Sequence, residues 1–264
     1  MSLAMTPAPH PVHLVGAGPG DPELLTLKAL RVLREASVIL VDDLVGEQVL
    51  AAALEGVAAA PRVVRVGKRG GCASTPQEFI EKLMVREALA GERVVRLKGG
   101  DPLVFGRGGE EIEALVAAGI AVEVVPGITA ALGCAASVGI PLTHRDHAQA
   151  CVFVTGHTRE GVAALDWQML SRPRQTVVIY MGIEALPTIA RQLMQHGLPA
   201  ATPAALIANG TTDRERRVIG TLATIGRQAM RAELDGPTLR ILGEVVALGS
   251  TSEREFPIES RIGL

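Results

Sequence analysis

The segment VVRLKGGDPLVFGRGGEE, residues 94–111, combines a strand-like start with two glycine clusters, an aspartate and an arginine. Asp101 follows Gly99 and Gly100 and precedes a proline, so the backbone can approach a ligand while the carboxylate is held in a rigid turn. A carboxylate beside bare carbonyl groups suits an amine, a ribose hydroxyl or a sulfonium cation, and it repels a phosphate. The segment therefore predicts a loop that binds a neutral or cationic ligand.

Arg107 is the cation of this segment, and its position is unfavourable for a helix start. A positive charge there opposes the helix dipole by ~0.3 to 1 kcal/mol, whereas Glu110 carries the sign that the dipole favours. Glycines flank the arginine on both sides, so its long side chain can reach an anionic substrate. A solvated loop arginine is the alternative interpretation.

The segment VGAGPGDP, residues 15–22, approaches the GxGxxG pattern of dinucleotide-binding folds. The third glycine of that pattern would be residue 21, which is Asp21, and an acid there would repel a pyrophosphate at the helix N-terminus. Asp42 and Asp43 end the next predicted strand, where a ribose-binding acid would lie. A dinucleotide oxidoreductase and a plain strand-to-helix turn both remain open as interpretations of this loop.

Short β-branched runs alternate with helical patterns along the chain, which predicts an α/β fold with mainly parallel strands. The predicted strands are residues 12–16, 37–42, 62–67, 93–99, 121–127, 150–156, 175–182, 203–210, 216–221 and 238–249. The predicted helices include residues 22–36, 75–91, 183–197 and 221–234. Closer spacing of the last strands indicates a mixed sheet with at least one antiparallel pair.

These patterns predict two α/β domains, residues 11–136 and 140–250, with flexible tails at 1–10 and 251–264. Four of the first five predicted strands end in glycine-rich or acidic loops. Ligands of open α/β sheets bind outside the carboxyl ends of the strands. The candidate residues are therefore expected on one rim of the N-terminal sheet.

Composition argues against several other classes of protein. A net charge of −2 and only six aromatic residues provide neither the basic field nor the stacking platforms of nucleic-acid-binding proteins. Residues 124–143 are uncharged, but prolines and glycines interrupt them, which favours a buried small-residue helix over a membrane span. His144 and His147 have HxxH spacing without a third ligand nearby in sequence, so no metal is predicted. Three unpaired cysteines and an opening unlike a signal peptide favour a soluble cytoplasmic protein.

Six motifs in order give the chain a resemblance to the tetrapyrrole methyltransferases from Val12 to about Leu248. The motifs are VGAGPGDPELLTLKAL, VGKRGG, VVRLKGGDPLVFGRGGEE, VVPGITAALGCAASVGIPLTHR, VIYMG and GEVV. Within that family the chain is most similar to the members that methylate uroporphyrinogen III. The resemblance implies a homodimer of two-domain α/β subunits that binds S-adenosylmethionine in the cleft between the domains, without a metal.

The resemblance also implies the residues of the site. Those expected to line the cofactor, mainly through the backbone, are Pro19, Gly99, Gly100, Asp101, Val104, Thr129, Ala130, Met181 and Gly210. Asp42 is the candidate proton acceptor and Lys68 the candidate donor, and Arg107 is a further candidate for assisting proton removal. The residues expected at the substrate and its carboxylates are Lys68, Arg69, Arg107, Glu110 and Arg145.

The implied reaction transfers methyl groups to C2 and C7 of uroporphyrinogen III and gives precorrin-2 by way of precorrin-1. One alternative is another precorrin methyltransferase of cobalamin synthesis, and a second is the dinucleotide-binding oxidoreductase. Precorrin-2 leads to sirohaem, cobalamin and haem d1, and the residues do not distinguish these branches.

Overall fold

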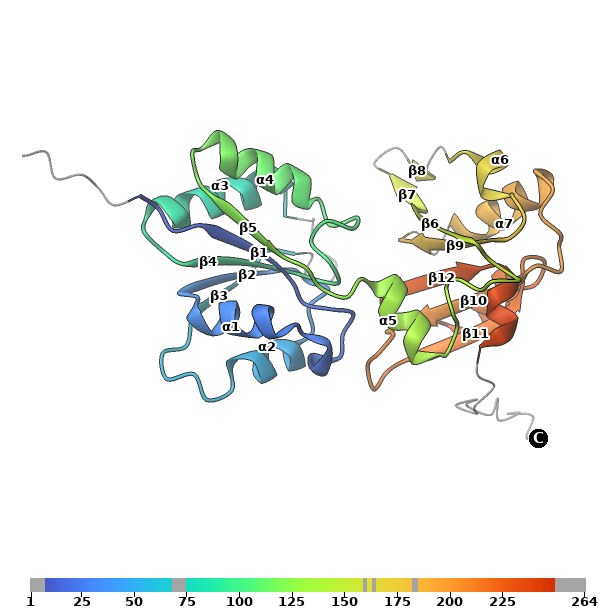
Figure 1. The fold of residues 1–264 in the computed structure, drawn as a ribbon, viewed down its shortest axis with the longest axis horizontal. Coiled ribbons are helices and arrows are strands. Elements are labelled where there is room, and N and C mark those ends of the chain that lie inside the picture. The colour runs from blue at the N-terminus through green and yellow to red at the C-terminus, as the bar shows by residue number, and fades with distance from the viewer. Residues whose placement is uncertain (1–7, 68–74, 159–160, 163–164, 182–184, 250–264) are drawn as a thin grey trace, which may run out of the picture.

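The computed structural model describes residues 8–67, 75–158, 161–162, 165–181 and 185–249, and Figure 1 shows two α/β halves joined through a short helix. The first sheet has five strands in the order β3-β2-β4-β1-β5, and every neighbouring pair is parallel. Its strands are β1 Val12–Gly16, β2 Val38–Val41, β3 Arg62–Arg65, β4 Val94–Lys98 and β5 Val122–Val125. The predicted parallel sheet is therefore confirmed.

Two helices cover each face of this sheet (Figure 1). Helices α1 (Leu27–Glu35) and α2 (Glu47–Leu54) pack on one face, and α3 (Gln77–Leu89) and α4 (Gly108–Ala117) pack on the other. The neighbouring strands β1 and β4 therefore lead to helices on opposite faces. Such a reversal leaves a crevice at the carboxyl ends of the two strands.

The helix predicted over residues 22–36 is two elements in the structure. Residues Pro22–Leu24 form a 3₁₀ turn, η1. The backbone N–H of Glu23 in this turn donates a hydrogen bond to Asp21 Oδ1 at 2.8 Å. Helix α1 starts afresh after Thr26, whose hydroxyl accepts a hydrogen bond from the Ala29 N–H at 3.1 Å. Each segment has its own capping side chain, so one continuous helix does not form.

The second sheet is mixed, as predicted, with the order β11-β10-β12-β9-β6. Strands β6 and β9 are parallel, and the other three pairs are antiparallel. The strands are β6 Ala150–Thr155, β9 Gln175–Tyr180, β10 Pro203–Ala208, β11 Arg216–Thr221 and β12 Thr238–Leu242. A small pair, β7 His157–Thr158 and β8 Gly161–Val162, and three helices, α6 Trp167–Leu170, α7 Leu186–Gln195 and α8 Ile225–Ala232, complete this half.

The last predicted strand, residues 238–249, is wrong beyond Leu242. Gly243 has φ 136°, a conformation open to glycine, and the chain then forms the 3₁₀ helix η3 over Glu244–Leu248. A strand ends where its backbone takes this conformation. Val245 and Val246 are buried as part of this helix and not as part of a strand, whereas Leu248 is 40% exposed.

Helix α5, Ala130–Ser137, lies between the two halves in Figure 1. Its buried face, which includes Ala131 and Cys134, shares one hydrophobic core with Ala205 and Ile241 of the second sheet. This confirms the small-residue helix, and no helix in the described ranges is long and apolar enough to span a membrane. The domain boundaries stay a prediction, and most of both predicted tails lies outside the described residues.

Candidate active site

The crevice at the carboxyl ends of β1 and β4 is built from glycine backbone. Gly18 and Gly100 lie next to each other there and exchange two backbone hydrogen bonds, from Gly100 N to Gly18 O at 2.8 Å and from Gly18 N to Gly100 O at 3.2 Å. Gly100 has φ 67°, which few other residues adopt. Gly16 and Gly127 pack so closely that a Cβ on Gly127 would lie 2.8 Å from the Gly16 Cα. The four glycines thus let three chain segments meet at one point.

Asp101 holds this arrangement together. Its Oδ1 accepts a hydrogen bond from the Leu103 N–H at 2.9 Å, and its Oδ2 accepts one from the Gly127 N–H at 3.1 Å. Both carboxylate oxygens therefore bind backbone of the loop and of the segment after β5. This fixing role was not foreseen from the sequence, and the contact of Asp101 with the cofactor stays a prediction.

We expect Gly127→Ala to destabilise the protein by about 1 to 3 kcal/mol, because its Cβ would overlap the Gly100 carbonyl oxygen and the Gly16 backbone. Gly109→Ala is the matched control, since a Cβ there meets nothing within 4 Å and the residue lies in α4. That control should gain a few tenths of a kcal/mol or more. Urea denaturation measures both, and equal stability of the two variants would contradict the packing described here.

Arg107 precedes α4 as its N-cap residue, with φ 59° and ψ 19°. Its Nε donates to both oxygens of Glu110, at 3.0 and 3.1 Å, and the two side chains remain 39% and 51% exposed. The hydrogen bonds to Glu110 raise the pKa of Arg107. Arg107 is thus a permanent cation, presented on a left-handed turn that costs a non-glycine residue about 1 kcal/mol or more.

A buried charge cluster, formed by Arg96, Lys98 and Glu111, lies beneath this loop. Glu111 is fully buried, and its Oε1 accepts from Arg96 Nε at 2.9 Å while its Oε2 lies 3.0 Å from Lys98 Nζ. Burial and the nearby Arg96 lower the pKa of Lys98, and Glu111 opposes that change. Arg96 Nη2 also lies 3.5 Å from Asp42 Oδ1. One guanidinium therefore connects the first turn of α4 with the predicted proton acceptor.

Sequence reasoning missed this cluster, although a signal was present. Arg96 and Lys98 alternate along β4, so both side chains face the same side of a strand whose other residues are apolar. Two cations on one face of a buried strand require nearby acids. Glu111 in the helix that follows was the available partner.

Tyr180, at the end of β9, joins the two halves beside the crevice. Its hydroxyl lies 2.7 Å from Thr129 Oγ1 and accepts a hydrogen bond from the Ala131 N–H at 3.0 Å. Its ring contacts Phe105 of the glycine loop, with the ring centroids 4.8 Å apart. Burial raises the pKa of Tyr180, so its hydroxyl stays protonated. Tyr180 thus fixes the start of α5 against the loop that carries Arg107.

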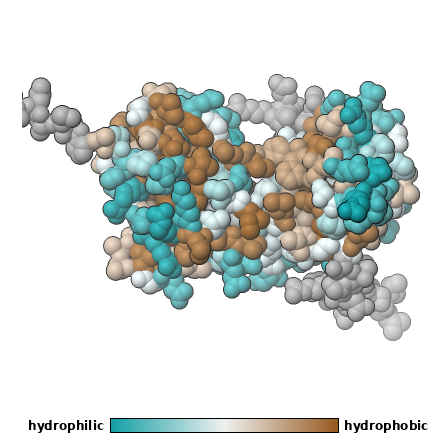
Figure 2. All heavy atoms as spheres, viewed as in Figure 1, coloured by the Kyte–Doolittle hydropathy of each residue, from teal (hydrophilic) through white to brown (hydrophobic). Residues whose placement is uncertain are grey.

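A second contact between the halves lies on the other side of α5. The Asp21 N–H donates to Thr211 Oγ1 at 3.1 Å, and Gly133 leaves room for the ring of Pro19. A cavity of about 790 Å³ opens along this contact. Its lining includes Asp21, Leu132 and Thr211. Figure 2 shows hydrophobic surface at the centre of the visible face, where α5 lies.

The structure brings most of the predicted cofactor residues to the two sides of α5. Pro19, Gly100, Asp101, Thr129 and Ala130 surround its first turns. Four predicted residues remain. Val104 and Gly99 belong to the glycine loop, Met181 follows Tyr180 and is 49% exposed, and Gly210 is buried against Cys134. A Cβ on Gly99 would lie 2.8 Å from that of Leu44, so glycine is needed there too.

The predicted substrate residues are less well gathered. Arg145 is exposed in a short hairpin between His144 and Ala148, apart from the glycine loop in the chain, and its carbonyl accepts a hydrogen bond from Arg174. Lys68 and Arg69 lie outside the described residues. His147 bonds to Glu244 at 3.0 Å, and no group of three or more metal-ligating residues occurs in the described part of the chain.

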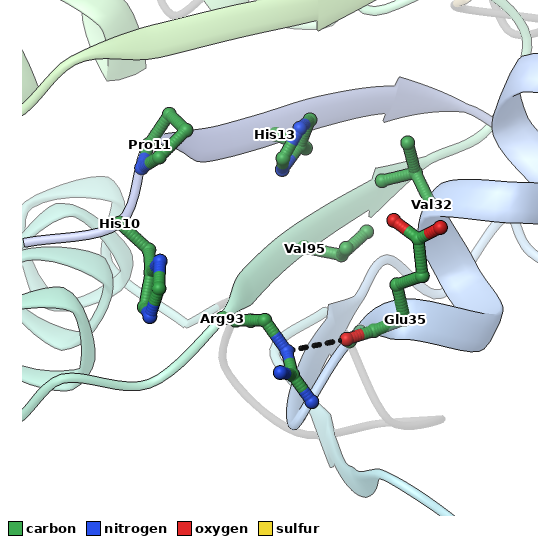
Figure 3. A pocket seen from close by; sticks show the side chains of 8 residues that line it. His10, Pro11, His13, Val32, Glu35, Arg93 and Val95 are labelled. Carbon is green, nitrogen blue, oxygen red and sulfur yellow. Dashed lines mark hydrogen bonds between the residues drawn. The ribbon is translucent and has the colours of Figure 1, made fainter.

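A smaller cavity of about 150 Å³ lies at the opposite, amino end of β1 and β4 (Figure 3). His13, Val32 and Val95 line it, and Arg93 closes one side by donating to the Glu35 carbonyl at 2.6 Å. Burial lowers the pKa of His13. Since ligands of open α/β sheets bind at the carboxyl ends, this cavity is not part of the candidate site.

The fold and the site define a class of two-sheet α/β proteins with closely packed glycine loops at the carboxyl ends of the first sheet and a cavity where the halves meet. A family model described as "Tetrapyrrole (Corrin/Porphyrin) Methylases" matches residues 11–226. The chain belongs to this family, which confirms the resemblance recognised in its motifs.

Solved structures and curated relatives agree with this assignment. The structure of a uroporphyrin-III C-methyl transferase from Thermus thermophilus complexed with S-adenyl homocysteine is 44% identical, with a TM-score of 0.77, and the match covers 90% of this chain and 99% of that one. The siroheme synthases of Nitrosococcus oceani and Methylococcus capsulatus are 53% and 54% identical over 90% and 92% of this chain. The chain spans about half the length of these curated relatives, 50% of each.

Proposed function

We propose that this chain is an S-adenosylmethionine-dependent C-methyltransferase that methylates uroporphyrinogen III at C2 and C7, giving precorrin-2 by way of precorrin-1. The observation that carries the proposal is the match over nearly the full length of the Thermus thermophilus structure, which was solved with the demethylated donor. The curated relatives are named siroheme synthases, which supports a role in siroheme formation. Methyl transfer is the one step of that synthesis that we assign to this chain, and we expect it to act as a homodimer.

The described residues fit a positively charged donor. The crevice has glycine backbone at Gly18 and Gly100, and the loops around it end in the acids Asp21, Asp42 and Asp101. Acids at these positions favour a cation and disfavour a pyrophosphate. Bound there, S-adenosylmethionine supplies an electrophilic methyl group on a sulfonium sulfur. Pro19, Gly99–Asp101, Val104, Thr129, Ala130, Met181 and Gly210 would hold it.

The work of the protein is then to place the macrocycle against the donor and to exclude water. Such positioning can lower a barrier by on the order of 7 to 11 kcal/mol. Arg107 is exposed and permanently charged, so it suits the carboxylates of the substrate. Arg96 and Lys98 are bound to Glu111 inside the protein and are not available for that role.

A proton must leave the macrocycle after a methyl group has been added, and a positioned base would contribute ~10² to 10⁴ in rate. Asp42 fits this role better than Arg107. Its carboxylate is partly exposed at the end of β2 and is oriented by Arg96. Arg107 cannot act as a base because Glu110 raises its pKa. The proposed role of Lys68 concerns a residue outside the described ranges.

Calorimetry with S-adenosylhomocysteine and with NADH tests the class of ligand. We expect binding of the first and none of the second, and the reverse would favour the oxidoreductase. Incubation with uroporphyrinogen III and methyl-labelled donor then tests the reaction. We expect two labelled methyl groups on each product molecule. A single methyl group, or transfer only to an already methylated precorrin, would contradict the proposed substrate.

A further inference from the structure

Arg240 is a buried cation without an acidic partner among the described residues. It lies in the middle of β12, between β10 and β9, and its side chain is fully buried. Its neighbours across the sheet are Leu206 and Ile179. Nη1 donates to the Met181 carbonyl at 2.7 Å, whereas Nε and Nη2 have no hydrogen-bond acceptor in the part of the chain described. Burial alone lowers its pKa to about 10.

Such an arrangement is unfavourable for stability. A buried charge without a counter-ion loses its hydration, and two unsatisfied N–H groups add to this cost. A buried ion that is replaced by an apolar side chain of similar volume often leaves a protein as stable as before, or more stable. Packing of the second sheet therefore does not explain an arginine at this position.

Among the described residues, the one hydrogen bond of the Arg240 side chain is to a strained turn. Met181 follows β9 with φ 57°, a left-handed conformation that is costly for a non-glycine residue. Its carbonyl points into the protein, because a Cβ on Gly156 would lie 2.8 Å from that oxygen. The Tyr180 carbonyl also accepts the Gly156 N–H, at 2.7 Å. The Met181 carbonyl accepts a hydrogen bond from the fully buried Arg240 side chain.

This turn belongs to the candidate site. Tyr180 hydrogen-bonds Thr129 and the first turn of α5, and the adjacent Met181 side chain is half exposed. The two residues of the turn are thus fixed from opposite sides, by α5 through the Tyr180 hydroxyl and by β12 through Arg240. The position of the Met181 side chain depends on both.

We propose that Arg240 is a positioning residue for the methyl donor, which holds the Tyr180–Met181 turn in its left-handed conformation and so presents Met181 to the ligand. The proposal rests on the proposed function, because it takes the ligand to be S-adenosylmethionine or its demethylated product. It predicts different outcomes for the affinity for the donor and for the stability of the fold. Replacing the arginine by an apolar residue weakens donor binding and does not weaken the fold.

The test compares Arg240→Met, a side chain of similar length without charge, with the wild type. S-adenosylhomocysteine affinity is measured by calorimetry and stability by urea denaturation. We expect the dissociation constant to rise at least 10-fold, while the denaturation midpoint stays the same or rises. Arg240→Lys, which keeps one cationic donor, should restore part of the affinity. Arg216→Met, at an exposed position on β11 of the same sheet, should change neither quantity.

Two results would overturn the proposal. One is an Arg240→Met protein whose dissociation constant stays within about twofold of the wild type. The other is an Arg240→Met protein that is less stable than the wild type, because Arg240 would then be a structural residue. Binding of S-adenosylhomocysteine to the wild type is measured first. If the wild type does not bind it, the proposed function is rejected, and this result is distinct from a failure of the proposal for Arg240.

Discussion

Arg107→Ala is expected to lower kcat/KM for uroporphyrinogen III at least 100-fold, about 2.7 kcal/mol of transition-state stabilisation. The dissociation constant of S-adenosylhomocysteine should change less than twofold. The reason is that Arg107 is an exposed, permanently charged group on the crevice loop, whereas the backbone glycines and Asp101 shape the donor site without it. Steady-state kinetics and calorimetry measure the two quantities.

One further variant separates the charge of Arg107 from its backbone strain. Arg107→Gly removes the same charge, and glycine adopts the left-handed conformation without strain. The glycine variant should therefore be as inactive as the alanine variant but more stable than it. Arg31→Ala is the matched control, since Arg31 is also an exposed arginine beside a glutamate, Glu35, on a surface helix. It should keep full activity. Normal turnover by Arg107→Ala would remove this residue from the mechanism.

Glu111→Ala is expected to destabilise the protein by about 3 to 5 kcal/mol, because it leaves Arg96 and Lys98 buried without their shared acid. Urea denaturation measures the loss. Glu111→Gln keeps the shape and one acceptor oxygen, and it should lose less than the alanine variant. In both variants Arg96 loses its nearest anion, so we expect Arg96 to hold the Asp42 carboxylate less firmly in its orientation.

Glu113→Ala is the control for this series, since Glu113 is exposed on the same helix and should change stability by no more than about 0.5 kcal/mol. The contradicting result is a Glu111→Ala protein as stable as this control. In that case Arg96 and Lys98 would have to find other partners, and the buried charge cluster would not support the loop above it.

The positions of the strands along the chain, and the rim that carries the candidate residues, could be predicted from local pattern. Parallel strands send their carboxyl ends to one edge, so the loops after β1, β2 and β4 had to meet once the helical and strand segments were recognised. The glycines at 99 and 100 were informative because close backbone approach leaves few alternatives. These features depend on residues near one another in the chain.

What could not be predicted depends on partners that are distant in sequence. Asp101 has the same type and spacing whether its oxygens bind a ligand or the backbone of Gly127, and only the fold decides. The turn of Tyr180 is fixed by Arg240, 59 positions beyond Met181. The break after Leu242 arises because Gly243 takes φ 136°, whereas the sequence pattern around it reads equally well as a continued strand.

The contacts that close the crevice span long stretches of chain. Thr129 meets Tyr180 across 51 positions, and Asp21 meets Thr211 across 190. Contacts between distant residues form late in folding, because loop closure costs entropy before they form. The complete pocket therefore exists only after the second half has docked on the first. Ligand affinity should thus be among the last properties that a refolding molecule acquires.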